Sequence, residues 1–161
     1  MRSRLIRIAV IFVVLVIGIL GAAQLVRPKQ TNPAIDPRRT LRSMMGTTSA
    51  VAATIDRSCG DCHSNATEWR WYTQVAPLSW IMVRAVDQGR KAVNFSEWTA
   101  YPPAQRRALL ALSCLDAMNG KMPMQAYLRF RSDAQLSPRD IETICAASRQ
   151  PEPGIASTER H

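Results

Sequence analysis

Hydrophobic positions divide the chain into one long apolar run near its start and several shorter segments with helical spacing. Residues 8–26 form an uncharged stretch rich in isoleucine, valine and leucine, and Gln24 is its one strongly polar side chain. After residue 39 no segment alternates between apolar and polar residues over a useful length, whereas several repeat apolar residues every three or four positions. The pattern predicts an all-α protein, with one small helical domain behind a single N-terminal transmembrane helix.

Four helices are expected in the domain, and local signals mark their ends. Pro77 and the Pro102-Pro103 pair suit the first turns of the second and third helices, because a proline there breaks no helical hydrogen bond. Asn119-Gly120 ends the third helix, and residues 137–140 have the cap, proline and acidic side chain of a capping box that starts the fourth. The residues in line on the four helices are Val51, Ile55 and Cys59, then Leu78, Ile81, Met82 and Ala85, then Ala108, Ala111, Leu112 and Leu115, and finally Ile141, Ile144, Cys145 and Ser148.

The apolar run is long enough to cross a membrane, because its 19 residues are close to the roughly 20 that a spanning helix needs. Arg2, Arg4 and Arg7 precede it, and basic residues favour the cytoplasmic side. We therefore expect a single-pass membrane protein, with its N-terminus in the cytoplasm and its helical domain exported across the membrane. A cleaved signal peptide is the alternative, since residues 21–23 are small, but Arg27 directly after the run favours a retained helix.

The predicted organisation has four parts. Residues 1–26 are the membrane anchor or signal peptide, residues 27–39 are a tether that three prolines interrupt, residues 40–150 are the helical domain, and residues 151–161 are a flexible tail. A domain of about 110 residues in short helices would by itself have a thin hydrophobic core. A large apolar cofactor would fill it.

Net charge changes this picture little. The chain carries +9, but residues 1–29 hold five basic residues and no acidic one, which leaves 16 basic against 12 acidic residues, or +4, in the rest. The excess therefore belongs largely to membrane targeting, and nucleic-acid binding is not expected. A mildly basic surface would suit an acidic redox partner or anionic lipid headgroups.

The most reactive side chains of the sequence lie together in one motif. It is Cys59-Gly60-Asp61-Cys62-His63, which has the C-x-x-C-H spacing of c-type haem attachment. Two thiols three positions apart on a helical turn can each form a thioether with one haem vinyl group. The following histidine is then held beneath the iron as its proximal ligand. The motif predicts one covalently bound haem c.

Three other uses of the cysteines fit the sequence less well. A thioredoxin-like pair expects a βαβ setting, which the pattern lacks. A structural zinc would need Cys59 and Cys62 together with Cys114 and Cys145, but the second pair has no close spacing. A disulfide within the motif would close a short, strained loop. We expect instead that Cys114 and Cys145 form a disulfide between the third and fourth helices, the alternative being two buried thiols.

A distal ligand to the iron has few candidates. The chain has two histidines, His63 and the terminal His161, so coordination by two histidines is not expected. Met122 and Met124 lie in a proline-stiffened loop after the third helix, which suits a rigidly held axial thioether. Spacing alone leaves both methionines open.

The stretch from Cys59 to about Leu136 carries further short motifs. They are Cys59-Gly60-Asp61-Cys62-His63-Ser64-Asn65, Trp69-Arg70-Trp71-Tyr72, Ala76-Pro77-Leu78-Ser79-Trp80, Gly89-Arg90-Lys91, Asn94-Phe95-Ser96-Glu97-Trp98, Lys121-Met122-Pro123 and Tyr127, with Asn32-Pro33 ahead of them. In these motifs the sequence resembles the small haem-binding domain family of bacterial exported or membrane-anchored proteins. The resemblance implies that the expected membrane is the bacterial inner (cytoplasmic) membrane and that the helical domain lies in the periplasm. The resemblance implies one covalent haem c in a cytochrome-c-like helical fold and favours Met122 as the distal ligand. Family members tend to carry a second proline where this chain has Met124.

The large side chains around these motifs are expected mainly to build the core. Met82 and Met118 lie on helical stripes, where packing is their expected use. The aromatic residues assigned to the core are Trp69, Trp71, Trp80, Trp98 and Tyr127. The alternative is contact with haem, with Trp80 or Tyr127 donating a hydrogen bond to a propionate and the Arg90-Lys91 pair neutralising its charge.

Haem with a histidine and a methionine ligand has no open iron position, so electron transfer rather than enzymatic catalysis is expected. The expected site is Cys59, Cys62, His63 and Met122, with the last two as iron ligands. The protein would act as a carrier or as a subunit of a membrane redox complex, with membrane-bound redox proteins as partners and residues 8–26 in the bilayer. One alternative is a haem-based sensor or peroxidase-like protein with a labile methionine. Another is a zinc or disulfide module without haem.

Overall fold

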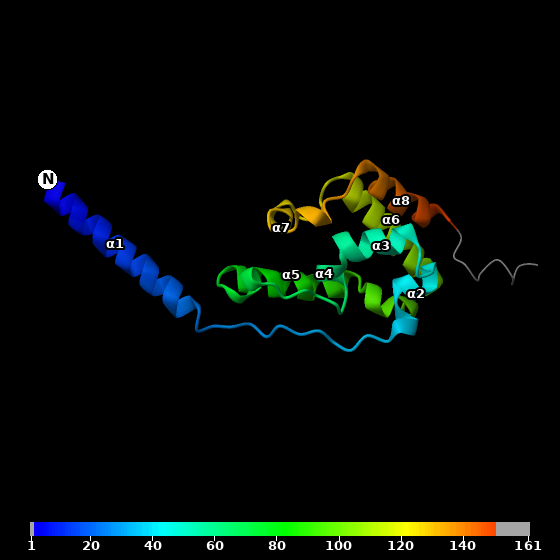
Figure 1. The fold of residues 1–161 in the computed structure, drawn as a ribbon, viewed down its shortest axis with the longest axis horizontal. Coiled ribbons are helices and arrows are strands. Elements are labelled where there is room, and N and C mark those ends of the chain that lie inside the picture. The colour runs from blue at the N-terminus through cyan, green and yellow to red at the C-terminus, as the bar shows by residue number, and fades with distance from the viewer. Residues whose placement is uncertain (1, 151–161) are drawn as a thin grey trace, which may run out of the picture. The chain divides into compact units, whose positions relative to one another are not determined.

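The computed structural model describes residues 2–150, and every regular element in that range is helical (Figure 1). The α-helices are α1 (Arg2–Ala23), α2 (Leu41–Met45), α3 (Ala50–Ser58), α4 (Gly60–His63), α5 (Leu78–Ala92), α6 (Pro103–Met118), α7 (Gln125–Leu128) and α8 (Pro138–Arg149). Between them lie the 3₁₀ turns η1 (Pro37–Arg39), η2 (Trp71–Gln74), η3 (Phe95–Ala100) and η4 (Ser132–Ala134). The predicted all-α fold is confirmed. The predicted flexible tail at 151–161, with His161, lies outside the described residues.

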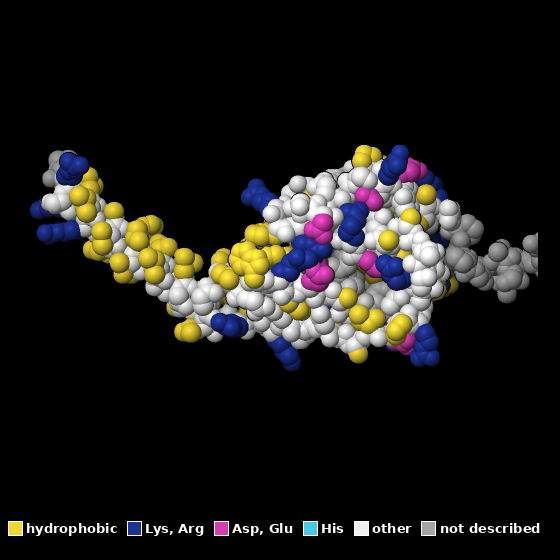
Figure 2. Space-filling model, in the orientation of Figure 1, with side chains coloured by type: hydrophobic (Ala, Val, Ile, Leu, Met, Phe, Trp, Pro, Cys, Tyr) yellow, Lys and Arg dark blue, Asp and Glu magenta, His cyan; other side chains and the backbone are white. Residues whose placement is uncertain are grey.

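The N-terminal helix differs from the others in its side chains. None of the residues of α1 is buried, and Figure 2 shows hydrophobic side chains along it with basic ones at its N-terminal end. The helix is long and apolar enough to cross a membrane, as the sequence predicts. Over the described range the chain forms two compact units, one of residues 2–31 and 69–85 and the other of residues 32–68 and 86–150. The part boundaries expected at residues 26, 39 and 150 stay predictions.

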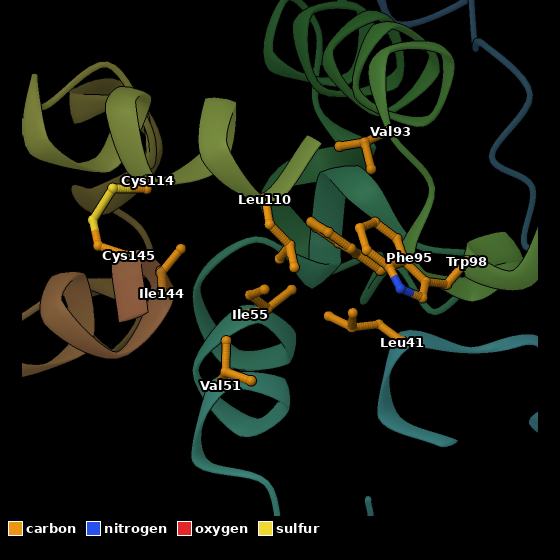
Figure 3. Packing of buried hydrophobic residues seen from close by; sticks show 10 residues of the cluster. All are labelled: Leu41, Val51, Ile55, Val93, Phe95, Trp98, Leu110, Cys114, Ile144 and Cys145. Carbon is orange, nitrogen blue, oxygen red and sulfur yellow. A yellow bond between two sulfur atoms is a disulfide. The ribbon is translucent and has the colours of Figure 1, made fainter. Parts of the chain in front are cut away.

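The second unit is built around α3, α6 and α8. Ile55 of α3, Leu110 of α6 and Ile144 of α8 are each at most 2% exposed. Phe95 and Trp98 enter the same core from η3. The hydrophobic cluster consists of Leu41, Val51, Ile55, Val93, Phe95, Trp98, Leu110, Cys114, Ile144 and Cys145 (Figure 3). Burial of these side chains away from water stabilises the arrangement of the three helices.

Local signals predicted the ends of the later helices correctly. α6 begins at Pro103 and has Asn119 as its C-cap, and Gly120 follows with a positive φ of 65°. Before α8, the Ser137 hydroxyl accepts from the Asp140 backbone N–H at 3.2 Å. Asp140 Oδ2 accepts from the Ser137 backbone N–H at 2.8 Å. Both N–H groups would otherwise lack a helical partner, so the predicted capping box is confirmed.

The buried face of α6 differs from the predicted one. Leu112 and Leu115 of the predicted stripe are 56% and 51% exposed, and Met118, also assigned to the core, is 64% exposed. The buried residues of α6 are Arg106, Leu110, Cys114 and Ala117. This helix has leucines on several faces, so apolar spacing alone does not select one. The link from Cys114 to α8 and the packing of Leu110 in the hydrophobic cluster determine which face is buried.

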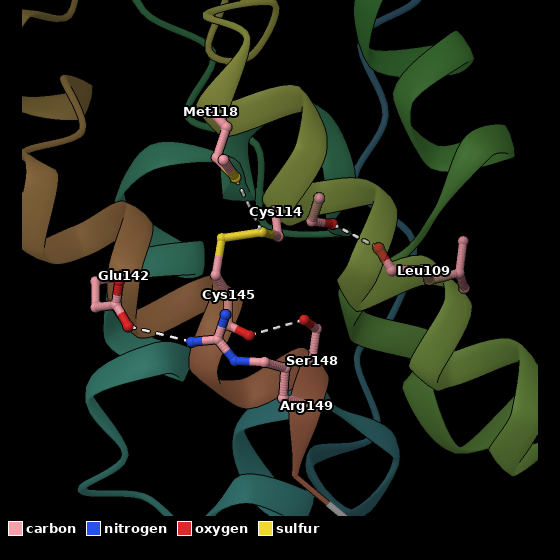
Figure 4. The surroundings of a disulfide bond; sticks show 8 residues. Leu109, Cys114, Met118, Glu142, Cys145, Ser148 and Arg149 are labelled. Atoms are coloured by element: carbon pink, nitrogen blue, oxygen red, sulfur yellow. Dashed lines mark hydrogen bonds and ion pairs between the residues drawn. A yellow bond between two sulfur atoms is a disulfide. The ribbon is translucent and has the colours of Figure 1, made fainter.

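Cys114 and Cys145 form a disulfide that joins α6 to α8, with their Cα atoms 4.9 Å apart (Figure 4). The predicted bond is thus confirmed, in place of two buried free thiols. Both residues belong to the hydrophobic cluster. Because they are linked to each other, neither can serve as a thiolate ligand for zinc.

Replacing both linked cysteines, as Cys114→Ala with Cys145→Ala, should lower the free energy of unfolding by about 3 to 4 kcal/mol. The bond connects residues 31 positions apart, and its loss increases the conformational entropy of the unfolded chain. Denaturant titration of the purified full chain in detergent, followed by circular dichroism, measures the change. A decrease of less than about 1 kcal/mol in the free energy of unfolding would contradict this account. Packing between α6 and α8 would then be what mainly holds the two helices together.

Candidate functional site

The cysteine motif lies where α3 ends and α4 begins. Val51 and Ile55 of α3 are buried and hold the helix in the core. At its C-terminal end the Cys59 N–H donates to Ile55 O at 2.8 Å. Cys59 O in turn accepts from the N–H groups of Cys62 at 3.2 Å and His63 at 3.0 Å. The structure therefore places the three chemically active side chains of the motif on one helical turn.

The His63 imidazole has one ring nitrogen in a hydrogen bond to the backbone. Its Nδ1 lies 3.2 Å from the carbonyl oxygen of Val93. A carbonyl oxygen can only accept, so Nδ1 carries the proton and Nε2 keeps its lone pair. Burial lowers the pKa of His63, which favours the neutral ring. A neutral imidazole oriented by a backbone carbonyl is the form in which histidine binds a metal.

Cys59 and Cys62 are free, half-buried thiols. Burial, with the neighbouring Cys62 as a smaller cause, raises the pKa of Cys59 to about 12. Burial and the charge of Asp61 raise the pKa of Cys62 to about 11. Cysteines that exchange disulfides have the opposite property, a lowered thiol pKa. With no strand among the described residues either, the surroundings of the motif do not support a thioredoxin-like reaction.

A zinc site also finds no support in residues 2–150. Within that range no three histidine, cysteine, aspartate or glutamate side chains are grouped so that they could hold a metal ion. The four cysteines that a zinc site would need are divided between the disulfide and the motif. Two thiols and one imidazole remain at the motif, which is the set that c-type haem attachment uses.

Gly89 of α5 lies against the backbone of the motif, a contact that was not expected. A Cβ at this position would lie 2.9 Å from the carbonyl carbon of Cys62 and 3.2 Å from its Cβ. Only glycine lets the two backbones approach this closely. The sequence did contain a signal for this contact, because a glycine inside a helical pattern often marks a packing constraint.

Gly89→Ala should destabilise the folded protein by about 1 to 2 kcal/mol. Alanine favours a helix by about 1 kcal/mol over glycine, but overpacking against backbone atoms typically costs about 1 to 3 kcal/mol or more. Gln88→Ala is the matched control, since Gln88 is exposed on the same helix and its loss should change stability by less than about 0.5 kcal/mol. Chemical denaturation compares the two variants. A Gly89→Ala chain as stable as the control would show that the contact does not restrict this position.

A buried polar network joins the motif to the chain around α7. The Tyr127 hydroxyl donates to Asp61 Oδ2 at 2.6 Å, and Arg131 Nη1 contacts the same oxygen at 2.7 Å. Burial and the bond to Asp61 raise the pKa of Tyr127, so its hydroxyl remains a donor. The other oxygen of Asp61 accepts from the Glu68 backbone N–H at 3.1 Å. Asp61, which lies between the two cysteines, thus binds side chains 66 and 70 positions further along the chain.

Both candidate distal ligands lie on the short loop between α6 and α7. Met122 is 38% exposed and Met124 is 37% exposed. The Met122 N–H donates to Asp116 O at 3.3 Å, and Met124 is the N-cap of α7. Tyr127 of the same helix is the residue that binds Asp61 of the motif. The loop and the motif are therefore linked, while exposure does not distinguish the two thioethers.

Two aromatic side chains that were assigned to the core are exposed. Trp71 is 75% exposed and Trp80 is 39% exposed, whereas Trp98 and Tyr127 are buried as predicted. Trp80 Nε1 donates to Val26 O at 2.7 Å. The two candidate propionate donors, Trp80 and Tyr127, therefore already have protein partners.

Arg90 holds the loop that follows the motif. Its Nε donates to Ser64 O at 2.7 Å, directly after His63. Its Nη2 donates to Thr67 Oγ1 at 2.8 Å and to Asn32 Oδ1 at 3.1 Å. In the structure this guanidinium binds protein groups, and the pairing with a propionate that the sequence offered as an alternative stays a prediction.

Two buried polar side-chain atoms of the described chain have no hydrogen-bond partner, namely Ser58 Oγ and Trp98 Nε1. Such atoms are uncommon, because burying an unpaired donor costs about 1 to 3 kcal/mol. Ser58 directly precedes the motif. The Trp98 ring lies 5.7 Å from that of Phe95 (Figure 3). The Phe95 ring in turn lies 6.1 Å from the His63 ring. An unpaired indole N–H in this position is a donor that a bound anionic group could use.

The comparisons with known proteins bear on the same part of the chain. A family model described as a haem-binding domain matches residues 18–150. No curated protein and no solved structure matches the chain. The matched stretch contains both motif cysteines, His63 and the methionine loop.

Proposed function

The chain belongs to the haem-binding domain family and therefore binds haem, and on this basis we propose that it is a c-type cytochrome that transfers electrons. The proposal includes one haem, attached covalently through Cys59 and Cys62. The observation that carries it is the combination of two free thiols and a neutral, oriented imidazole on one helical turn. That combination has a direct use in haem c attachment.

The residues around the motif fit this cofactor. The thiols of Cys59 and Cys62 would hold haem by adding to its two vinyl groups, and Nε2 of His63 would bind its iron. Gly89 keeps α5 against the motif, and the unpaired Nε1 of Trp98 is suited to a propionate. When bound, haem supplies the one-electron couple of its iron.

Met122 is the proposed distal ligand. The Tyr127–Asp61 hydrogen bond holds the chain after the methionine loop to the motif, which supports a position for that loop near the cofactor. A thioether ligand in addition to His63 would leave small molecules no open site on the iron. The protein is then an electron-transfer protein rather than an enzyme, and methionine shifts its potential upward.

We also propose that α1 anchors the protein in the bacterial inner membrane, with its N-terminus in the cytoplasm and the haem in the periplasm. The apolar length of α1 and the arginines at its N-terminal end support this orientation. An anchor confines the protein to the membrane surface and raises its effective concentration beside membrane-bound redox partners. It would serve them as a carrier or as a complex subunit.

Spectroscopy and redox titration of the purified full chain test this function. We expect a low-spin, six-coordinate spectrum in both oxidation states, a reversible one-electron couple and slow reaction of the reduced form with carbon monoxide. A high-spin reduced form that binds carbon monoxide rapidly would instead indicate a sensor or a peroxidase-like protein. A chain purified from cells that make haem c, yet without haem, would contradict the proposal.

A further inference from the structure

Four large apolar side chains are exposed in the segment that completes the first unit. Trp71 is 75% exposed, Ile81 57%, Val75 45% and Trp80 39%. Single exposed apolar residues are ordinary on protein surfaces, but four of them within eleven positions form a concentration that indicates contact with something else. We refer to these four residues as the 71–81 surface.

Hydrogen bonds attach the segment that carries this surface to the residues directly after α1. Gln24 binds the Ala76 backbone twice, since its Nε2 donates to Ala76 O at 3.2 Å and its Oε1 accepts from the Ala76 N–H at 3.0 Å. Trp80 Nε1 donates to Val26 O at 2.7 Å. Gln24 and Val26 are among the last residues of the apolar run 8–26. The 71–81 surface is therefore fixed to the point where the candidate membrane span ends.

The charge of the same unit is of one sign. Residues 1–31 and 69–85 contain no aspartate or glutamate. After α1 the basic residues of the unit are Arg27, Lys29, Arg70 and Arg84. Tryptophan is enriched at the headgroup level of membranes, and basic side chains there are attracted to anionic lipids.

We propose that the 71–81 surface docks into the headgroup region of the bilayer that α1 crosses, an inference that rests on the proposed membrane anchor. The bilayer is favoured over a partner protein because the surface is bonded to the end of the spanning run and because the charged residues of its own unit, residues 1–31 and 69–85, are all basic. Docking moves Trp71, Val75 and Ile81 out of water, which is the driving force. The C-terminal end of α1 then has a second, interfacial attachment besides the span itself.

Photo-cross-linking of the haem-loaded full chain in lipid nanodiscs tests this inference. The nanodiscs contain phosphatidylglycerol and phosphatidylcholine of defined mass. Three variants each carry one benzoylphenylalanine. One has it in place of Ile81, and the two reference variants have it in place of Val14 or Leu112. Val14 lies in the middle of the proposed span, and Leu112 is an equally exposed apolar residue of α6 that should stay in water. An unchanged haem spectrum shows that each variant is folded, and mass spectrometry identifies lipid adducts.

We expect lipid adducts at positions 14 and 81, with a yield at position 81 several-fold above that at position 112. If position 14 gives lipid adducts but the yield at position 81 is no higher than that at position 112, the docking is overturned and the anchor stays intact. Absence of adducts at position 14 would refute the anchor and, with it, the docking that depends on it. In native membranes, a protein adduct at position 81 in place of the lipid adduct would also overturn the proposal.

A charge placed on the surface gives an independent result. Trp71→Glu in the chain that carries the cross-linker at position 81 should lower the lipid adduct several-fold, because a carboxylate resists entry into an anionic interface. Leu112→Glu in the same chain is the matched control and should leave the yield unchanged. Equal yields in the two variants would overturn the proposal.

Discussion

Removing both motif cysteines should leave the haem extractable by solvent. In Cys59→Ala with Cys62→Ala, we expect acidified acetone to remove essentially all the haem, whereas the unmodified chain retains it. The reason is that in the proposed attachment the two thioethers are the only covalent bonds between cofactor and chain, and the proposed ligand His63 is protonated and released by acid. Haem staining of a denaturing gel and the pyridine haemochrome spectrum measure the outcome.

The single variants and a second cysteine pair serve as controls. Cys59→Ala or Cys62→Ala alone should leave one thioether, with a haemochrome band between those of the double variant and the unmodified chain, because each unreacted vinyl group extends the conjugated system. Cys114→Ala with Cys145→Ala removes the same number of cysteines and should keep the haem covalently bound. Retention of haem on the gel by the chain without Cys59 and Cys62 would contradict covalent attachment at the motif.

What could be predicted from the sequence is what a few neighbouring residues determine together. The C-x-x-C-H motif lies on one helical turn, and its hydrogen bonds from Cys59 O to the N–H groups of Cys62 and His63 are local. The capping box of Ser137 and Asp140 is local in the same sense. In each case the chemistry of the side chains and the geometry of a turn suffice, so no knowledge of the tertiary fold is needed.

The faces of the helices could not be predicted in the same way. α6 has apolar residues all round, and which of them is buried depends on α8, to which Cys114 is linked. Ile81 was placed on a predicted stripe, yet it is 57% exposed. Such a stripe indicates contact with an apolar environment, but it does not say whether that environment is the core or a membrane. The assignment of Ile81 and Trp71 to the core was therefore wrong, but their apolar character still indicates that this surface contacts an apolar environment.

Contacts between residues far apart in the chain could not be predicted from the sequence either. The Asp61 carboxylate, the Tyr127 hydroxyl and the Arg131 guanidinium meet only after folding, and no spacing rule connects residues 66 or 70 positions apart. The close approach of Gly89 to Cys62 is of the same kind. These contacts determine how the motif is held, so they complete a site whose reactive groups the sequence alone had indicated.

Met122→Ala should remove the methionine-to-iron charge-transfer band and lower the reduction potential by a substantial part of the ~0.8 V range that axial ligands span. A thioether stabilises ferrous iron relative to ferric iron, so replacing it with water or an open position favours oxidation. The reduced form should also become high-spin and bind carbon monoxide rapidly. Near-infrared absorption and a redox titration of the full chain measure these changes.

Met124→Ala is the matched control, because Met124 lies on the same loop and its exposure of 37% nearly equals the 38% of Met122. The two substitutions remove the same thioether-bearing side chain, so a general loosening of the loop should affect both chains alike. A ligand role predicts that only one of them loses the charge-transfer band, and we expect that one to be Met122→Ala. If Met124→Ala loses the band and Met122→Ala keeps it, the distal ligand is Met124, at the position where this chain departs from the proline usual in the family. If both chains keep the band, methionine is not the ligand, and the proposed electron-transfer function loses its filled sixth position.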